Sequence, residues 1–146
     1  MSTLLLVLDL AGTFVFALAG ATAAVARGSW LQPKLFTETP AMGPSGQTPA
    51  PLPTAPAPLN PASVQALQTM MREVVTGGTG AALGDVPGAA VHAKTGTAEF
   101  DNNPANTHAW TVGWQGDIAF VVFVEKGGTS TGTAVPIVEA FLRGIA

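Results

Sequence analysis

The run of residues that can carry chemistry is Lys94-Thr95-Gly96-Thr97-Ala98-Glu99. Alternate side chains of a β-strand share a face, so Lys94 and Gly96 point the same way. A lysine ammonium can hold a carboxylate, and a glycine beside it lets the backbone of a substrate lie close to the strand. Thr95 offers a hydroxyl donor, and the backbone N–H of Thr97 is available to stabilise an oxyanion. We therefore predict substrate binding at Lys94, Thr95, Gly96 and Thr97.

The other side chains that could bind a ligand are expected to be structural. His92 and His108 have no carboxylate at ligand spacing, and the chain has no cysteine, so we predict no metal site and no cofactor. Trp110 and Trp114 fall on the same face of an alternating strand. At that spacing a role in the core is expected rather than a platform for stacking a sugar.

The composition excludes a further class of function. Only 10% of the 146 residues are charged and the net charge is −3, so there is no basic face to neutralise phosphates. We therefore expect no nucleic-acid binding. The length of the chain is that of one domain. Its apolar residues and prolines are unevenly distributed, so we divide the chain into residues 1–30, 31–60 and 61–146.

Residues 61–146 are predicted to form the elements that position the candidate site. Asn60-Pro61 begins a helix whose apolar residues, Met70 and Met71 among them, recur at helical spacing and are expected in the core. Three strands follow, over 89–99, 107–114 and 117–126, the last apolar on both faces, and a helix over 133–145 closes the chain. The predicted fold is α+β, with a three-stranded antiparallel sheet, flanking helices and an N-terminal apolar helix.

The first sixty residues are expected to hold an apolar helix and a connector. Residues 4–26 contain one charge, Asp9, and are long enough to cross a bilayer, although a buried core helix is the alternative. Arg27 and Lys34 would keep the remainder in the cytoplasm if this helix crossed a membrane. Nine of the twelve prolines fall within 33–62, which predicts an extended, polyproline-like connector over 31–60.

The order of motifs resembles the C-terminal part of the transpeptidase domain of penicillin-binding proteins. The resemblance rests on the Met71-Arg72-Glu73-Val74-Val75 helix, on the Lys94–Glu99 run and on His108-Ala109-Trp110. It is firm over residues 61–146, and residues 24–33, which look like the family's upstream helix, suggest that it starts as early as Ala21. It implies part of a penicillin-recognising fold that binds substrate at Lys94–Thr97. Serine β-lactamases share the Lys-Thr-Gly element. Residues 8–14 are instead similar to the opening helix of small membrane proteins related to glycine transporters.

Two motifs of that family are absent. The family attacks with the serine of a Ser-x-x-Lys element and uses a second element, Ser-x-Asn or Tyr-x-Asn. No serine of this chain has lysine three residues later or asparagine two residues later, and there is no tyrosine. Because removal of a nucleophile costs orders of magnitude in rate, we expect no catalytic residue and no transpeptidase turnover from this chain alone.

Three hypotheses follow from these observations: a catalytically incomplete transpeptidase fragment, a small membrane-anchored binding protein, and a fused gene fragment without function. The expected partners are a peptidoglycan stem peptide or a β-lactam, bound at most weakly, together with a membrane and further copies of the chain at exposed sheet edges. The resemblance implies a location at the cell membrane, with residues 61–146 outside the cytoplasm. Arg27 and Lys34 conflict with that topology, and a core helix over 4–26 would remove the conflict.

Overall fold

Three antiparallel strands form the sheet that carries the candidate site. In the computed structural model, which describes residues 10–33 and 55–146, these strands are β3 (His92–Glu99), β4 (Thr107–Gln115) and β5 (Ile118–Val124), in the order β3-β4-β5. Gly96 of β3 pairs with Trp110 of β4. Gly116 turns the chain between β4 and β5 with a φ of 54°, which glycine adopts without strain. The α+β prediction with a three-stranded antiparallel sheet is confirmed.

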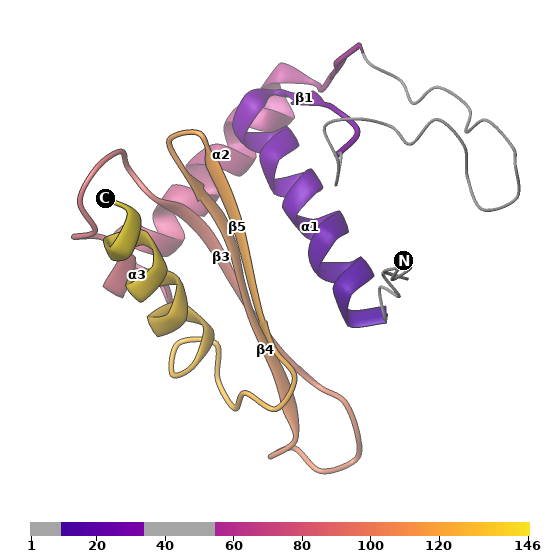
Figure 1. Cartoon of the computed structure of the whole chain (residues 1–146), viewed down its shortest axis with the longest axis vertical. Coiled ribbons are helices and arrows are strands. Elements are labelled where there is room, and N and C mark those ends of the chain that lie inside the picture. Colours follow the sequence, from indigo (N-terminus) through magenta and orange to yellow (C-terminus); the bar gives the residue numbers. More distant parts are fainter. Residues whose placement is uncertain (1–9, 34–54) are drawn as a thin grey trace, which may run out of the picture.

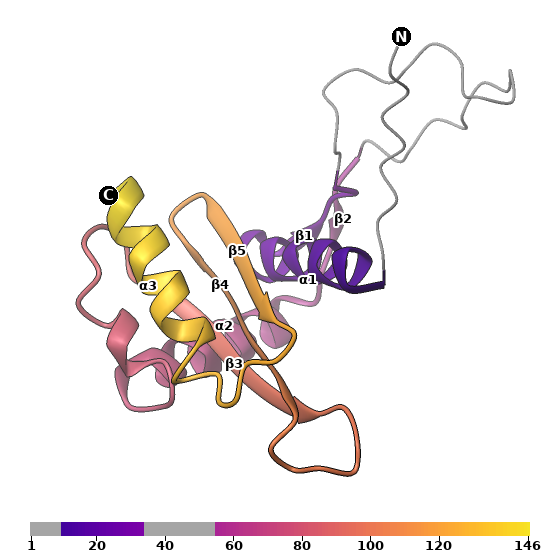
Figure 2. The same ribbon diagram turned by 60° about the horizontal axis from the view of Figure 1, so that its bottom comes forward.

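Helices cover both faces of this sheet. Helix α3 (Ala134–Ile145) lies on one face and α1 (Leu10–Arg27) on the other, and α2 (Pro61–Thr76) contacts β3 and α1 (Figure 1, Figure 2). The alternation of β4 sorts its residues as predicted: Trp110, Val112 and Trp114 face the α1 side. The larger core cluster fills the α3 side and contains Ala93, Phe120, Val135, Val138 and Leu142, together with Val75, Leu83, Val86 and Val91.

β5 differs in part from the expectation of a fully covered strand. Of its seven residues Phe120 is buried, Ile118 is exposed and the other five are half-buried. The reason is its position, because β5 is the outer strand on its side of the sheet. Cover from α1 and α3 on the two faces therefore leaves the edge of the strand accessible.

Helix α2 begins where the sequence predicts. The Asn60 side chain accepts a hydrogen bond of 3.1 Å from the backbone N–H of Ser63, and Pro61 occupies the first turn. The buried stripe of this helix is Val64, Met71 and Val75. Met70, which the sequence analysis placed in the core, is 52% exposed, so that assignment was wrong. One residue is a turn of about 100° around a helix, and Met70 is rotated by that angle away from the stripe.

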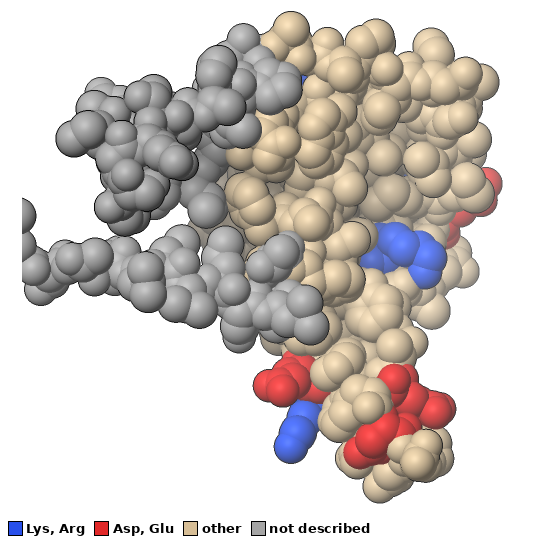
Figure 3. Space-filling view, turned by 90° about the vertical axis from the view of Figure 1, so that its right-hand side faces the viewer, with Lys and Arg blue, Asp and Glu red and all other residues tan. Residues whose placement is uncertain are grey.

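Helix α1 packs on the sheet. Its Leu18, Val25 and Ala26 lie against the cluster formed by Met71, Val112 and Trp114. No helix within the described residues is long and apolar enough to cross a membrane, so the membrane-spanning interpretation of residues 4–26 is not supported. Residues 4–9 of that stretch lie outside the described part. Figure 3 views the molecule from the α1 side and shows that charged side chains are few on this face: some lie near its lower end, a basic group lies near mid-height, and an acidic group lies at the right rim.

The two ends of the connector are paired with each other. β1 (Ser29–Trp30) and β2 (Ala57–Pro58) form a short antiparallel pair, and the N–H of Leu59 donates to the carbonyl of Gly28 at 3.0 Å. The sequence analysis did not predict this pairing. Most of the predicted polyproline-like connector, residues 34–54, lies outside the described residues.

Candidate functional site at the outer edge of β3

β3 is the edge strand of the sheet, and no other strand of the described residues pairs with its outer side. In an antiparallel ladder, the backbone groups of alternate residues point toward the partner strand and those of the others point away. The carbonyl of Val91 accepts from the Arg72 guanidinium at 2.7 Å and that of Thr95 accepts from the Lys94 ammonium at 2.5 Å, so both point outward. Thr97 shares their parity, and its N–H therefore faces the open edge.

Lys94 and Gly96 lie on the α1 side of the strand, as the period of two predicts. Lys94 is exposed, and its bond to the Thr95 carbonyl holds the ammonium at the strand edge. The space above Gly96 is taken by the indole of Trp110, because a Cβ added at Gly96 would lie against that ring. On this face the missing side chain therefore accommodates Trp110, and the approach for a ligand is along the edge of the strand.

Thr95 and Thr97 point to the opposite side, where α3 lies. Thr95 is 7% exposed and its hydroxyl lies 2.5 Å from that of Thr79, in the loop that follows α2. The backbone carbonyl of Thr79 in turn accepts from the Thr131 hydroxyl at 3.4 Å. The structure thus places the Thr95 hydroxyl in an internal contact and leaves the Thr97 side chain exposed.

Thr97 is held by the loop between β5 and α3. Its hydroxyl oxygen accepts a hydrogen bond of 3.1 Å from the backbone N–H of Ser130. The Ser130 hydroxyl donates to the carbonyl of Trp110 at 2.7 Å and lies 3.1 Å from the hydroxyl of Thr111. Two loops distant in sequence therefore fix the two threonines of the candidate run.

The site contains no arrangement suited to nucleophilic attack within the described residues. Ser130 is the serine bonded to the candidate run, but it is 3% exposed and its hydroxyl is engaged with Trp110. The position three residues after Ser130 is Thr133, not lysine. An activated serine needs a neighbouring base, and none contacts Ser130.

The two histidines pack against aromatic rings. His92 stacks on Trp114 with ring centroids 4.5 Å apart, and His108 stacks on Phe100 at 4.6 Å. Burial lowers the pKa of His92 below its usual value of 6.5; the hydrogen bond to the Ala90 carbonyl opposes this, and the charge of Arg72 lowers the pKa further. No three His, Asp or Glu side chains in the described part of the chain lie close enough to hold a metal ion.

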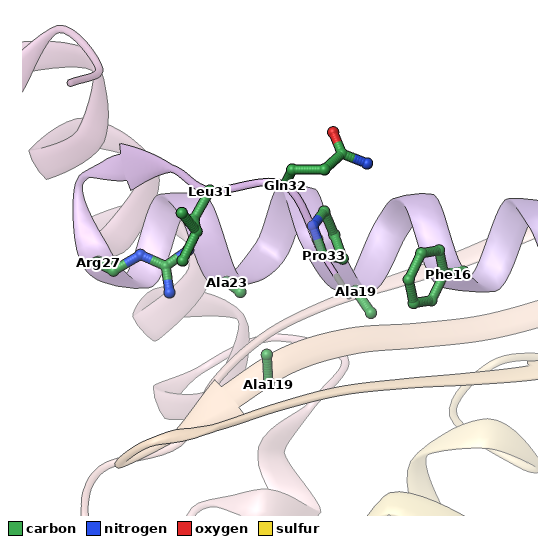
Figure 4. A pocket seen from close by; sticks show the side chains of 9 residues that line it. Phe16, Ala19, Ala23, Arg27, Leu31, Gln32, Pro33 and Ala119 are labelled. Carbon is green, nitrogen blue, oxygen red and sulfur yellow. The ribbon is translucent and has the colours of Figure 1, made fainter. Parts of the chain in front are cut away.

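A groove lies elsewhere, between α1, residues 31–33 and the start of β5 (Figure 4). This open groove has a volume of about 510 Å³ and is lined mainly by apolar and small side chains, with Arg27 as its ionisable group. It includes none of the residues Lys94–Thr97. Without a nucleophile, an acid or a base among its lining residues, the groove is a weaker candidate for chemistry than the edge of β3.

The sequence analysis missed Thr79 and Ser130. Thr79 lies in a glycine-rich turn, and Ser130 was tested only as the first residue of a nucleophile motif. Their contacts with Thr95 and Thr97 span 16 and 33 residues of the chain. No local pattern marks contacts over such separations, so only the folded arrangement identifies them.

The chain matches the sequence model of the penicillin-binding protein transpeptidase domain over residues 15–143. This match begins within α1, well before the range of 61–146 on which the resemblance rested. Residues 8–14 lie before the start of this match, and their suggested similarity to glycine-transporter-like membrane proteins is not supported, since no described helix is long and apolar enough to span a membrane. No curated protein matches the sequence.

Solved structures give the same fold. The D,D-transpeptidase domain of a peptidoglycan glycosyltransferase from Eggerthella lenta aligns with a TM-score of 0.61 at 24% identity, covering 85% of this chain and 30% of that one. Penicillin-binding protein A from M. tuberculosis, in a ceftriaxone acyl-enzyme complex, aligns with 0.62 at 25% identity over 84% and 30%. PBP2 of Pseudomonas aeruginosa aligns with 0.61 at 28% identity over 86% and 28%.

The chain therefore spans less than a third of the length of each of these proteins. The agreement between the family match, the aligned folds and the Lys94–Thr97 edge strand leads to one conclusion. The chain belongs to the family of penicillin-binding protein transpeptidase domains.

Proposed function

We propose that this chain forms the Lys-Thr-Gly wall of a penicillin-binding site, binds a peptidoglycan stem peptide or a β-lactam weakly, and has no transpeptidase turnover of its own. The observation that carries the proposal is the open edge of β3. There the ammonium of Lys94, held on the Thr95 carbonyl at 2.5 Å, lies on the same strand as the outward N–H of Thr97.

This edge offers donors suited to an extended, anionic ligand. A peptide strand can add to an unpaired sheet edge through backbone hydrogen bonds, which is a common mode of peptide recognition. Lys94 supplies a positive charge for a carboxylate, and Thr97 supplies an exposed hydroxyl and an outward N–H. Gly96 and Thr95 contribute indirectly, Gly96 by making room for Trp110 and Thr95 through the carbonyl that anchors Lys94.

The sequence supports the proposed absence of turnover. No Ser-x-x-Lys element is present, so an acyl-enzyme has no nucleophile on which to form. Donors that bind an oxyanion can still favour ligand binding when the nucleophile is missing. We therefore expect reversible binding and no covalent adduct.

The proposal is tested by two measurements on the full chain. Fluorescent penicillin should leave no covalent label, as seen by intact mass, and benzylpenicillin or a D-alanyl-D-alanine peptide should shift the NMR signals of residues 94–97 reversibly. Lys94→Met should abolish most of the binding, whereas Lys126→Met, at an exposed lysine beyond the end of β5, should leave it unchanged. An acyl adduct on any serine would overturn the proposal, and so would the absence of binding by the wild type.

We extend the proposal to location and assembly. Peptidoglycan lies outside the cytoplasm, so binding to it requires the sheet and α3 to be exported. A reporter enzyme that is active only after export, fused after Ala146, should then be active in cells. The outer edges of β3 and β5 also favour association between copies of the chain, since unpaired strand edges recruit further strands.

A further inference from the structure

Ser130 connects three elements around the candidate site. Its backbone N–H donates to the Thr97 hydroxyl oxygen of β3, and its hydroxyl donates to the Trp110 carbonyl of β4. Its own carbonyl accepts from the N–H of Val135, in the first turn of α3, at 2.9 Å. Ser130 is 3% exposed and Thr111 is fully buried, so the bond between their hydroxyls is shielded from competing water, whereas the bond to Thr97 lies partly at the surface.

The direction of each proton in this network follows from its partners. A carbonyl oxygen can only accept, so the single proton of the Ser130 hydroxyl points to Trp110. Thr111, 3.1 Å away, must then be the donor of the bond between the two hydroxyls. A backbone N–H can only donate, so Thr97 accepts from Ser130 and its own hydroxyl proton remains available.

We propose that Ser130 is a positioning residue that orients Thr97 to donate its hydroxyl proton toward the carboxylate of a ligand at the open edge of β3. This inference deepens the proposed function and rests on it. The N–H of Ser130 occupies an acceptor direction on the Thr97 oxygen and limits rotation of the side chain. The Thr97 hydroxyl leaves the strand on the α3 side, and the Lys94 ammonium is held at the strand edge by the Thr95 carbonyl. We expect the two donors together to distinguish a carboxylate at this edge from a neutral group.

The test compares benzylpenicillin with its methyl ester, because the two differ in the group that Thr97 and Lys94 are argued to hold. The measured quantity is the ratio of the two dissociation constants, ester over free acid, for reversible binding to the full chain. Thr97→Val, which keeps the shape of the side chain, should lower this ratio about tenfold, and Thr97→Ser should retain it.

Ser130→Ala removes the bonds to Trp110 and Thr111 but keeps the N–H, so the ratio should fall by a smaller factor, about three- to tenfold. Asn60→Ala is the matched control: it removes a helix cap at the other end of α2 from the Thr79 loop and should lower stability while preserving the ratio. A purely structural role for Ser130 would lower both affinities equally.

The outcomes separate the two proposals. If the wild type binds neither ligand, both proposals fail. If the wild type prefers the free acid and neither Thr97→Val nor Ser130→Ala changes that preference, the positioning role is overturned and the proposed function stands. If Ser130→Ala does not fold, the positioning role is tested with the Thr97 variants and with the hydrogen exchange rate of the Ser130 amide. That exchange should become faster in Thr97→Val, and an unchanged rate would overturn the proposal.

Discussion

The indole ring of Trp110 lies against Gly96, its partner across the β3–β4 ladder, at the position of the Lys94–Thr97 run that has no side chain. The same residue accepts the Ser130 hydroxyl on its carbonyl oxygen. Trp110 therefore contacts Gly96 on one face of β3 through its ring, and is linked to Thr97 on the other face through Ser130. A substitution at Gly96 should therefore change the geometry of β3, although glycine has no side chain to make a contact of its own.

We expect Gly96→Ala to destabilise the fold by about 1–3 kcal/mol, the usual cost of forcing an additional methyl group into a packed position. The new Cβ would displace the Trp110 ring, so tryptophan fluorescence should shift together with the midpoint of urea unfolding. Gly144→Ala is the control, because no heavy atom lies within 4 Å of a Cβ at that position in α3. Equal effects of the two substitutions would contradict the packing argument.

Asn60→Ala should lower the free energy of unfolding by about 1 kcal/mol. The variant loses the 3.1 Å bond that the Asn60 side chain accepts from the Ser63 N–H, which satisfies one of the free amides at the start of α2. Asn60→Asp retains an acceptor at the same place and should recover most of the loss, as measured by chemical denaturation. A cap that contributes nothing would leave all three proteins with the same midpoint.

Stability should decrease below about pH 6.5 in part because of His92. Burial lowers the folded-state pKa of His92, so the unfolded chain takes up a proton first as the pH falls, and protonation then favours unfolding. His92→Phe keeps a ring that can stack on Trp114 but cannot titrate, and its stability should fall less between pH 7 and pH 5. Thermal melts between pH 7 and pH 5 measure the loss of stability. An equal loss in the wild type and in His92→Phe would exclude His92 as a cause of the pH dependence.

Association between copies of the chain should depend on the outward apolar face of α3 as well as on the outer edges of β3 and β5. Ile137, Phe141 and Ile145 follow one another at a spacing of four along this helix, and 47–48% of each is exposed. Phe141→Glu should reduce the apparent mass in light scattering at high protein concentration, since it places a charge within the apolar face. Ala140→Glu adds the same charge to an exposed position outside that face, and association that is equally sensitive to both would argue for a general charge effect.

The elements of residues 60–146 could be predicted because their signals are local. Asn60 and Pro61 mark the start of α2, and the alternation from Thr107 to Trp114 sorts β4 between its two faces. Local patterns predict less accurately on which side of the helix Met70 lies. Neighbouring residues differ by about 100° around the helix, so Met71 is buried while Met70 is exposed.

The surroundings of the candidate site could not be predicted in the same way. Ser130 and Thr79 reach β3 only after the chain has folded back on itself, so no periodicity carries the information. The position of α1 on the sheet has the same origin. Its apolar composition is compatible with a bilayer and with a protein core, so its packing against Val112 and Trp114 could not be read from that composition.

The pairing of β1 with β2 has a consequence for engineering the chain. Ser29 and Trp30 are bound to Pro58 and Ala57, so both ends of the connector are anchored side by side irrespective of its length. Doubling the number of residues between them should cost about 0.6 kcal/mol in closure entropy. An insertion between β1 and β2 should therefore cost little stability, and a comparison of urea midpoints measures that cost.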